Sequence, residues 1–172
     1  VNRIPDTRFI SVGQVIFVPL RPTPSIPIPP LAPPPTPPSP PVTGINQTSL
    51  VRDGLRHTFM INKTSFFRGE PMRLSLSKTN ITGSPVSITY RGSQRYDFIV
   101  TQGGREVWRW SEGRFFTFAI ETITVGPGQR LLHVQTWNQM TNRGILVTPG
   151  TYTVTAVNTG TGVRLSLQIQ IR

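Results

Sequence analysis

VRLSLQIQI, at residues 163–171, alternates strictly between apolar and polar side chains. Its apolar members, which would share one face of an extended chain, are Val163, Leu165, Leu167, Ile169 and Ile171. Because side chains in a strand point alternately to opposite faces, this pattern predicts a β-strand with one buried face and one face in water. TYTVTAVN, at residues 151–158, precedes it across a short glycine-containing link, so the two segments predict a β-hairpin.

The same kind of pattern continues toward the N-terminus. Further short runs rich in β-branched and aromatic residues are HTFMIN (57–62), MRLSLSK (72–78), VSITYR (86–91), YDFIVT (96–101), REVWRW (105–110), ETITV (121–125) and RLLHVQTW (130–137). Gly103-Gly104 is typical of a two-residue hairpin turn, and the only candidate for a turn of helix is RFFTFAIE at 114–121. Eight or nine short strands separated by turn residues predict an all-β chain folded as a two-sheet antiparallel β-sandwich.

A proline-rich stretch divides the chain. Thirteen of its 18 prolines lie between Pro19 and Pro41, and proline fixes φ near −65° without offering an N–H. This stretch therefore predicts a semi-rigid polyproline II spacer, and its PxxP pattern is also one that aromatic-lined grooves bind. We expect an N-terminal strand segment at 1–20, a linker at 21–45 and a β-sandwich domain at 46–172. No apolar run is long enough to predict a membrane span.

The formal net charge is +11, and it comes from 16 arginines and only two lysines against seven acidic residues. Such a charge raises nucleic acid as a partner, because clustered cations displace counterions from a phosphate backbone. The arginines, however, are scattered along the chain without a basic run, which argues against a specific nucleic-acid site. Anionic cell-wall polymers or acidic proteins fit this distribution better.

The sequence predicts no enzyme, cofactor or metal site. Cysteine is absent, His57 and His133 lack metal-ligand spacing, and no nucleophile-elbow or phosphate-loop motif occurs. Glu106 and Glu112 could be proposed as a catalytic carboxylate pair, but neighbouring arginines favour surface ion pairs. The tryptophans of VWRW share one strand face, with Arg109 pointing outward; core packing is the favoured interpretation over an exposed binding platform.

Residues 94–156 carry a more specific pattern. YDF (96–98), VWRWSEG (107–113), GPGQ (126–129), TW (136–137) and PGTY (149–152) follow one another in an order that closely resembles the BsuPI-type intracellular proteinase inhibitor domain. The resemblance extends over about residues 55–172. It implies an immunoglobulin-like β-sandwich and inhibition of a serine proteinase inside the cell. The resemblance does not identify any particular residue as inhibitory. An inhibitor of this kind would present a loop such as 111–116 or 138–148 to the protease.

PDTRFISVGQVIFVP, at residues 5–19, is similar to the closing third of a LysM peptidoglycan-binding module. The earlier strand and the two helices of a LysM are not in the sequence, so this resemblance implies attachment to cell-wall glycan only if the chain extends upstream.

VGQVIFVPL, at residues 12–20, is apolar on both faces, and water exposure would forgo about 1.5–3 kcal/mol for each large side chain. Such a strand could complete a LysM, fold back on its own sandwich, or pair with the sheet edge of another copy. Our leading hypothesis is the third, a non-enzymatic surface protein of the cell or spore whose copies associate by strand donation, with fibres where the contact does not close into a ring. A proteinase inhibitor or protein-binding module is the alternative. The donated residues would be Phe9, Ile10, Val12, Val15, Ile16, Phe17, Val18 and Leu20.

Overall fold

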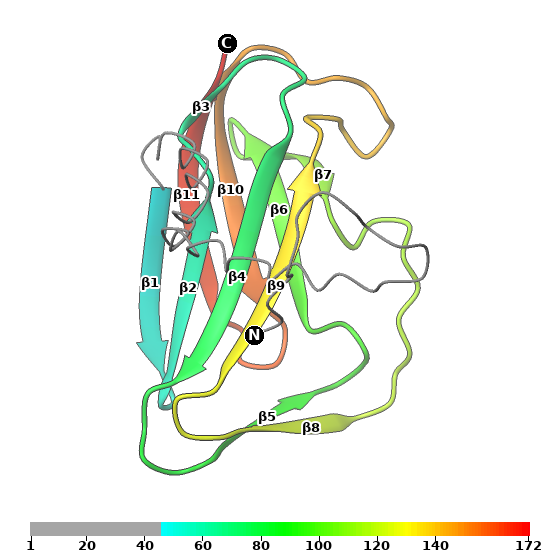
Figure 1. Ribbon diagram of the computed structural model, residues 1–172. Coiled ribbons are helices and arrows are strands. Elements are labelled where there is room, and N and C mark those ends of the chain that lie inside the picture. Colours follow the sequence, from blue (N-terminus) through cyan, green and yellow to red (C-terminus); the bar gives the residue numbers. More distant parts are fainter. Residues whose placement is uncertain (1–45) are drawn as a thin grey trace, which may run out of the picture. The chain divides into compact units, whose positions relative to one another are not determined.

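A computed structural model describes residues 46–172, which form eleven strands and no helix (Figure 1). In this part of the chain no helix is long and apolar enough to cross a membrane. The strands are β1 (Asn46–Arg52), β2 (Leu55–Ile61), β3 (Ser65–Phe66), β4 (Met72–Asn80), β5 (Val86–Tyr90), β6 (Tyr96–Gln102), β7 (Arg105–Arg109), β8 (Glu121–Val125), β9 (Arg130–Trp137), β10 (Gly150–Asn158) and β11 (Arg164–Ile171).

The strands form two main sheets that face each other. The first sheet has the order β1-β2-β4-β9, and the second sheet has the order β3-β11-β10-β6-β7. All neighbours are antiparallel except the short β3, which runs parallel to β11. A separate ribbon of β5 and β8 lies across one end (Figure 1). The predicted all-β antiparallel sandwich is confirmed.

The core lies between the two sheets, and strands of both sheets supply it with buried apolar side chains. Phe59 of β2 and Leu76 of β4 belong to the same buried cluster as Val154 of β10 and Ile169 of β11. The alternation of 163–171 is confirmed, because its apolar positions are buried or half-buried while its polar positions are exposed. Burying each large apolar side chain contributes about 1.5–3 kcal/mol, so this face holds the sheets together.

The predicted hairpins are also present. β6 and β7 are joined by Gly103-Gly104, both with positive φ, 54° and 79°, which is the backbone that a tight hairpin turn needs. The turn at 159–162 joins β10 to β11. Each predicted strand lies within about two residues of an observed one.

Three features of the fold differ from the prediction. Strands β1 and β3 were not predicted; β1 pairs with β2 across Asp53-Gly54, and β3 is too short to show any period. The candidate helical turn at 114–121 is wrong. Residues 114–120 are an irregular segment without regular secondary structure, and β8 begins at Glu121.

Candidate functional site

Two long connections meet beside β7. We call residues 110–120, between β7 and β8, the first loop, and residues 138–148, between β9 and β10, the second loop. Asn142 of the second loop accepts a hydrogen bond from the amide of Arg109 at 2.8 Å and donates one from its own amide to the carbonyl of Val107 at 3.0 Å. The two loops are therefore fixed to the same strand although they are far apart in sequence.

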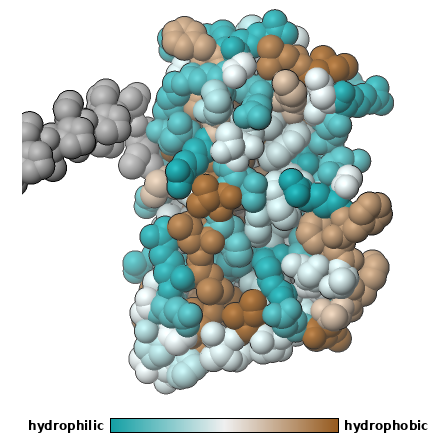
Figure 2. Space-filling view, turned by 45° about the vertical axis from the view of Figure 1, so that its right-hand side comes forward, coloured by the Kyte–Doolittle hydropathy of each residue, from teal (hydrophilic) through white to brown (hydrophobic). Residues whose placement is uncertain are grey.

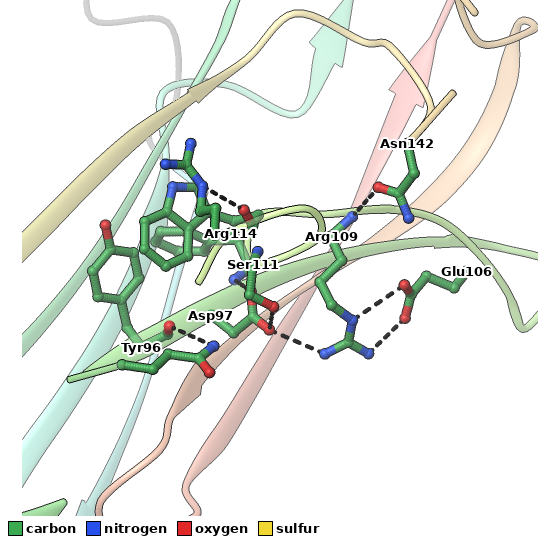
Figure 3. Close-up of polar contacts among 10 residues, drawn as sticks. Tyr96, Asp97, Glu106, Arg109, Ser111, Arg114 and Asn142 are labelled. Atoms are coloured by element: carbon green, nitrogen blue, oxygen red, sulfur yellow. Dashed lines mark hydrogen bonds and ion pairs between the residues drawn. The ribbon is translucent and has the colours of Figure 1, made fainter. Parts of the chain in front are cut away.

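A buried carboxylate holds the start of the first loop. Asp97 of β6 is only 4% exposed, and its Oδ1 accepts hydrogen bonds from the amides of Phe98 (2.9 Å) and Ser111 (3.1 Å). Its Oδ2 accepts from the Ser111 hydroxyl (2.7 Å) and from Arg109 Nη1 (3.0 Å) (Figure 3). Burying a charge costs much free energy unless it is paired and hydrogen-bonded. This set of partners ties the sheet firmly to the loop.

Arg109 links that carboxylate to a second one at the surface. Its Nε and Nη2 donate to Glu106 at 3.1 Å and 2.6 Å, a two-point contact with a planar fork (Figure 3). Hydrogen bonds with Glu106, and after them those with Asp97, raise the pKa of Arg109 above its ordinary value. The surface ion pair predicted for Glu106 is confirmed. Arg109 is half-buried between the two acids rather than simply outward.

Trp108, in β7, and Trp110, directly after β7, contact both the core and the surface. The ring of Trp108 stacks on that of Trp137 at 5.9 Å, and the ring of Trp110 stacks on that of Tyr96 at 4.4 Å. Both are half-buried and pack against the main core, as predicted. They also line a surface depression of about 530 Å³, together with residues of the second loop that include Met140.

The first loop is anchored at points on both sides of one exposed ring. Arg114 Nε donates to the carbonyl of Trp110 at 2.8 Å, and its guanidinium lies 4.6 Å from the centre of the Trp110 ring. Further along, the amide of Thr117 donates to Ser93 Oγ and its carbonyl accepts from the Ser93 amide, both at 3.0 Å. Between these anchors, the side chain of Phe115 is 101% exposed.

Other apolar side chains of the two loops also face solvent. They are Phe118, Ile120, Met140 and Ile145. Figure 2 shows apolar side chains gathered on the face that this view brings forward, including its right-hand edge. The second loop is itself held in shape, because Thr141 donates its amide to the carbonyl of Ile145 at 2.8 Å and Met140 is bridged to Leu146. Large exposed apolar side chains on restrained loops are typical of interaction surfaces.

The sequence-based site predictions have different outcomes. The residues proposed for strand donation, like the LysM-like stretch at 5–19, lie outside the described residues, so both remain predictions. His57 and His133 lie on β2 and β9, and no group of three metal-ligating side chains occurs in 46–172. The loops named at 111–116 and 138–148 are brought together. The anchors at Asp97, Ser93 and Asn142 were missed, because their partners are distant in sequence.

With this geometry established, the comparison with protein families is decisive. A profile described as BsuPI, intracellular proteinase inhibitor, matches residues 59–163, which is more than half of the chain. The chain belongs to the BsuPI family. The match lies within the predicted range of 55–172 and contains the first loop and the second loop. It does not reach the LysM-like stretch, for which the comparisons offer no support.

Solved structures share only a general likeness with this BsuPI domain. Pseudomonas fluorescens alkylpurine DNA glycosylase AlkC, bound to DNA containing an abasic site analogue, is 16% identical with a TM-score of 0.42, covering 69% of this chain and 30% of its own. Listeria innocua β-glucosidase in complex with glucose is 9% identical with a TM-score of 0.39, covering 75% of this chain and 16% of its own. The CARDB domain of a Pyrococcus furiosus protein, in complex with di-metal ions, is 10% identical with a TM-score of 0.36, covering 74% of this chain and 89% of its own. A comparison with curated proteins gives no match.

Proposed function

We propose that the described domain is a protein-binding module that inhibits a serine proteinase, and that the first loop and the second loop form its binding surface. The observation that carries the proposal is a pair of apolar, solvent-facing loops held by a buried polar network within a domain of the BsuPI family. The family match favours this interpretation over strand donation, which no observation on residues 46–172 supports.

The anchoring of the loops supports binding on energetic grounds. Association costs free energy for each side chain and loop that must be ordered, and a surface that is already ordered avoids part of that cost. Here the first loop is fixed at Ser111, Arg114 and Thr117, and the second at Asn142. The apolar side chains that they carry can then bury area against a partner without a large ordering penalty.

The net charge of the chain and the description of its family indicate which kind of protease it binds. A net charge of +11 favours association with a protein that is acidic overall, because complementary fields accelerate encounter. The family is described as intracellular, so we propose a protease of the cell interior as the target, rather than a role at the cell or spore surface.

Inhibition assays with the full chain test this proposal. We expect the chain to inhibit at least one enzyme of a panel containing subtilisin-type, chymotrypsin-type and trypsin-type serine proteases. Substituting both Met140→Asp and Ile145→Asp should weaken that inhibition at least about tenfold, because charges would enter a buried apolar contact.

Val51→Asp is the matched control, since Val51 is a similarly exposed apolar residue on β1, outside both loops. It should leave inhibition unchanged. If the unaltered chain inhibits no member of the panel, the proposed function is wrong.

A further inference from the structure

We infer that Phe115 is the side chain that enters the primary specificity pocket of the target protease, so that the target prefers large apolar or aromatic residues. The inference rests on the proposed function and specifies its partner. Serine proteases recognise one side chain of a bound segment in a deep pocket, which is apolar in chymotrypsin-type enzymes and acidic in trypsin-type enzymes.

The exposure of Phe115 sets it apart from its neighbours. Its ring is fully exposed, whereas the next residue, Phe116, is half-buried, with its ring 5.9 Å from that of Trp110. Successive side chains of an extended segment point to opposite sides. One phenylalanine therefore fastens the loop to the domain while the other is presented outward. A fully solvent-exposed aromatic ring on a restrained backbone is the type of anchor that dominates protein interfaces.

The backbone around Phe115 is also available to a partner. Within residues 46–172, neither its amide nor its carbonyl is hydrogen-bonded to another group, although the loop is held at Arg114 on one side and Thr117 on the other. An extended segment with free main-chain groups can add to the edge of a partner's sheet, where main-chain hydrogen bonds give affinity and side-chain pockets give specificity.

Other exposed residues of the loops are less suitable. Arg114 would suit an acidic pocket, but its guanidinium already lies on the Trp110 ring and its Nε is bound to the Trp110 carbonyl. Phe118 is 95% exposed, but it follows the anchor at Thr117 instead of lying between two anchors, and it lines a different depression, of about 490 Å³. Phe115 alone combines full exposure with anchors on both sides.

The test compares variants of the full chain against chymotrypsin and trypsin. The unaltered chain should inhibit chymotrypsin more strongly than trypsin. Phe115→Ala should weaken inhibition of chymotrypsin by about 30-fold or more, the loss expected when a central anchor is removed. Phe115→Arg should shift inhibition from chymotrypsin toward trypsin. Phe118→Ala, at an exposed ring of the same loop, should weaken inhibition less than Phe115→Ala does. Phe67→Ala, at an exposed ring outside both loops, is the matched control and should leave inhibition unchanged.

Because the Phe115 ring touches solvent only, its variants should keep the circular dichroism and melting temperature of the unaltered chain. If the chain inhibits chymotrypsin but Phe115→Ala does so equally well, or if Phe118→Ala causes the larger loss, the role of Phe115 is wrong and the proposed function stands. Stronger inhibition of trypsin by the unaltered chain also overturns the inference. If the unaltered chain inhibits no serine protease of the wider panel, both fail together.

Discussion

Several ionisable side chains lie on the inner face of the first sheet instead of on its surface. Lys78 of β4 is fully buried and donates a hydrogen bond to Tyr90 Oη at 2.8 Å. His57 lies directly opposite Lys78 on the neighbouring strand β2. Burial, and after it the charge of Arg95, lowers the pKa of Lys78 to about 8. Burial also raises the pKa of Tyr90 to about 12. These two side chains, whose pKa values are shifted, therefore lie in the core of the domain, away from the proposed binding loops.

Acid should destabilise the domain through its histidines. Burial, followed by the charge of Lys78, lowers the pKa of both His57 and His133 from 6.5 to about 4. As pH falls, the unfolded chain binds these protons first, so stability present above about pH 6.5 is lost as pH falls toward 4. For the fully buried His57 alone, the loss is on the order of 2 kcal/mol. Urea unfolding at pH 7, 5 and 4 measures it.

His57→Leu provides the comparison for that experiment, since it removes one titrating group and keeps an apolar side chain on the inner face. Its free energy of unfolding should depend less on pH between 6.5 and 4, whatever its absolute value. Equal pH dependence for both proteins would contradict the assignment. Half-buried groups outside the core such as Glu70, whose pKa is lowered by its hydrogen bond with Lys63, titrate alike in both proteins.

Strands with one wet face were the easiest elements to predict from sequence. β11 has the clearest alternation, because one of its sides meets the core and the other meets water, and the first half of β4 shows the same pattern. β1 was missed because most of its residues on both faces are exposed, so burial imposes no pattern on NQTSLVR. The segment 114–121 was the one candidate for a helical turn, because it is rich in apolar residues. Several of these residues face solvent instead of a core, and hydrophobic periodicity cannot distinguish the two cases.

Gly92 is the position where the first loop depends most on the absence of a side chain. A Cβ there would lie 2.5 Å from the carbonyl oxygen of Thr117, so Gly92→Ala must displace the loop from Ser93. We expect inhibition to weaken about tenfold through loss of preorganisation, with the free energy of unfolding changed by about 1 kcal/mol or less. Protease titration together with thermal unfolding measures the two effects separately.

Gly83→Ala is the matched control, because a Cβ at Gly83 meets no atom within 4 Å and its backbone has no positive φ. It should leave both inhibition and stability nearly unchanged. An equal loss of inhibition in the two variants would show that the contact between Gly92 and Thr117 does not position the loop.

The meeting of the two loops depends on the whole topology. The second sheet places β7 at its edge beside β6, and β9 forms the edge of the first sheet, so their following connections converge at one place. Alternation within each strand contains no information on strand order, which is why sequence patterns could name both loops but not their contact through Asn142. The family resemblance supplied the expectation that such loops bind a protease.

Removing residues 1–20 separates the two functions considered for this protein. The family match and the described core both lie within 46–172, so we expect the shortened chain to inhibit a protease as strongly as the full chain. The strand-donation hypothesis expects the full chain to form polymers and the shortened chain to be monomeric, because the apolar strand at 12–20 is then lost. Light scattering and electron microscopy of both proteins measure association, and polymers that persist without residues 1–20 would contradict strand donation. Loss of inhibition on the same deletion would instead show that the N-terminal segment takes part in protease binding, and the two loops would then be insufficient.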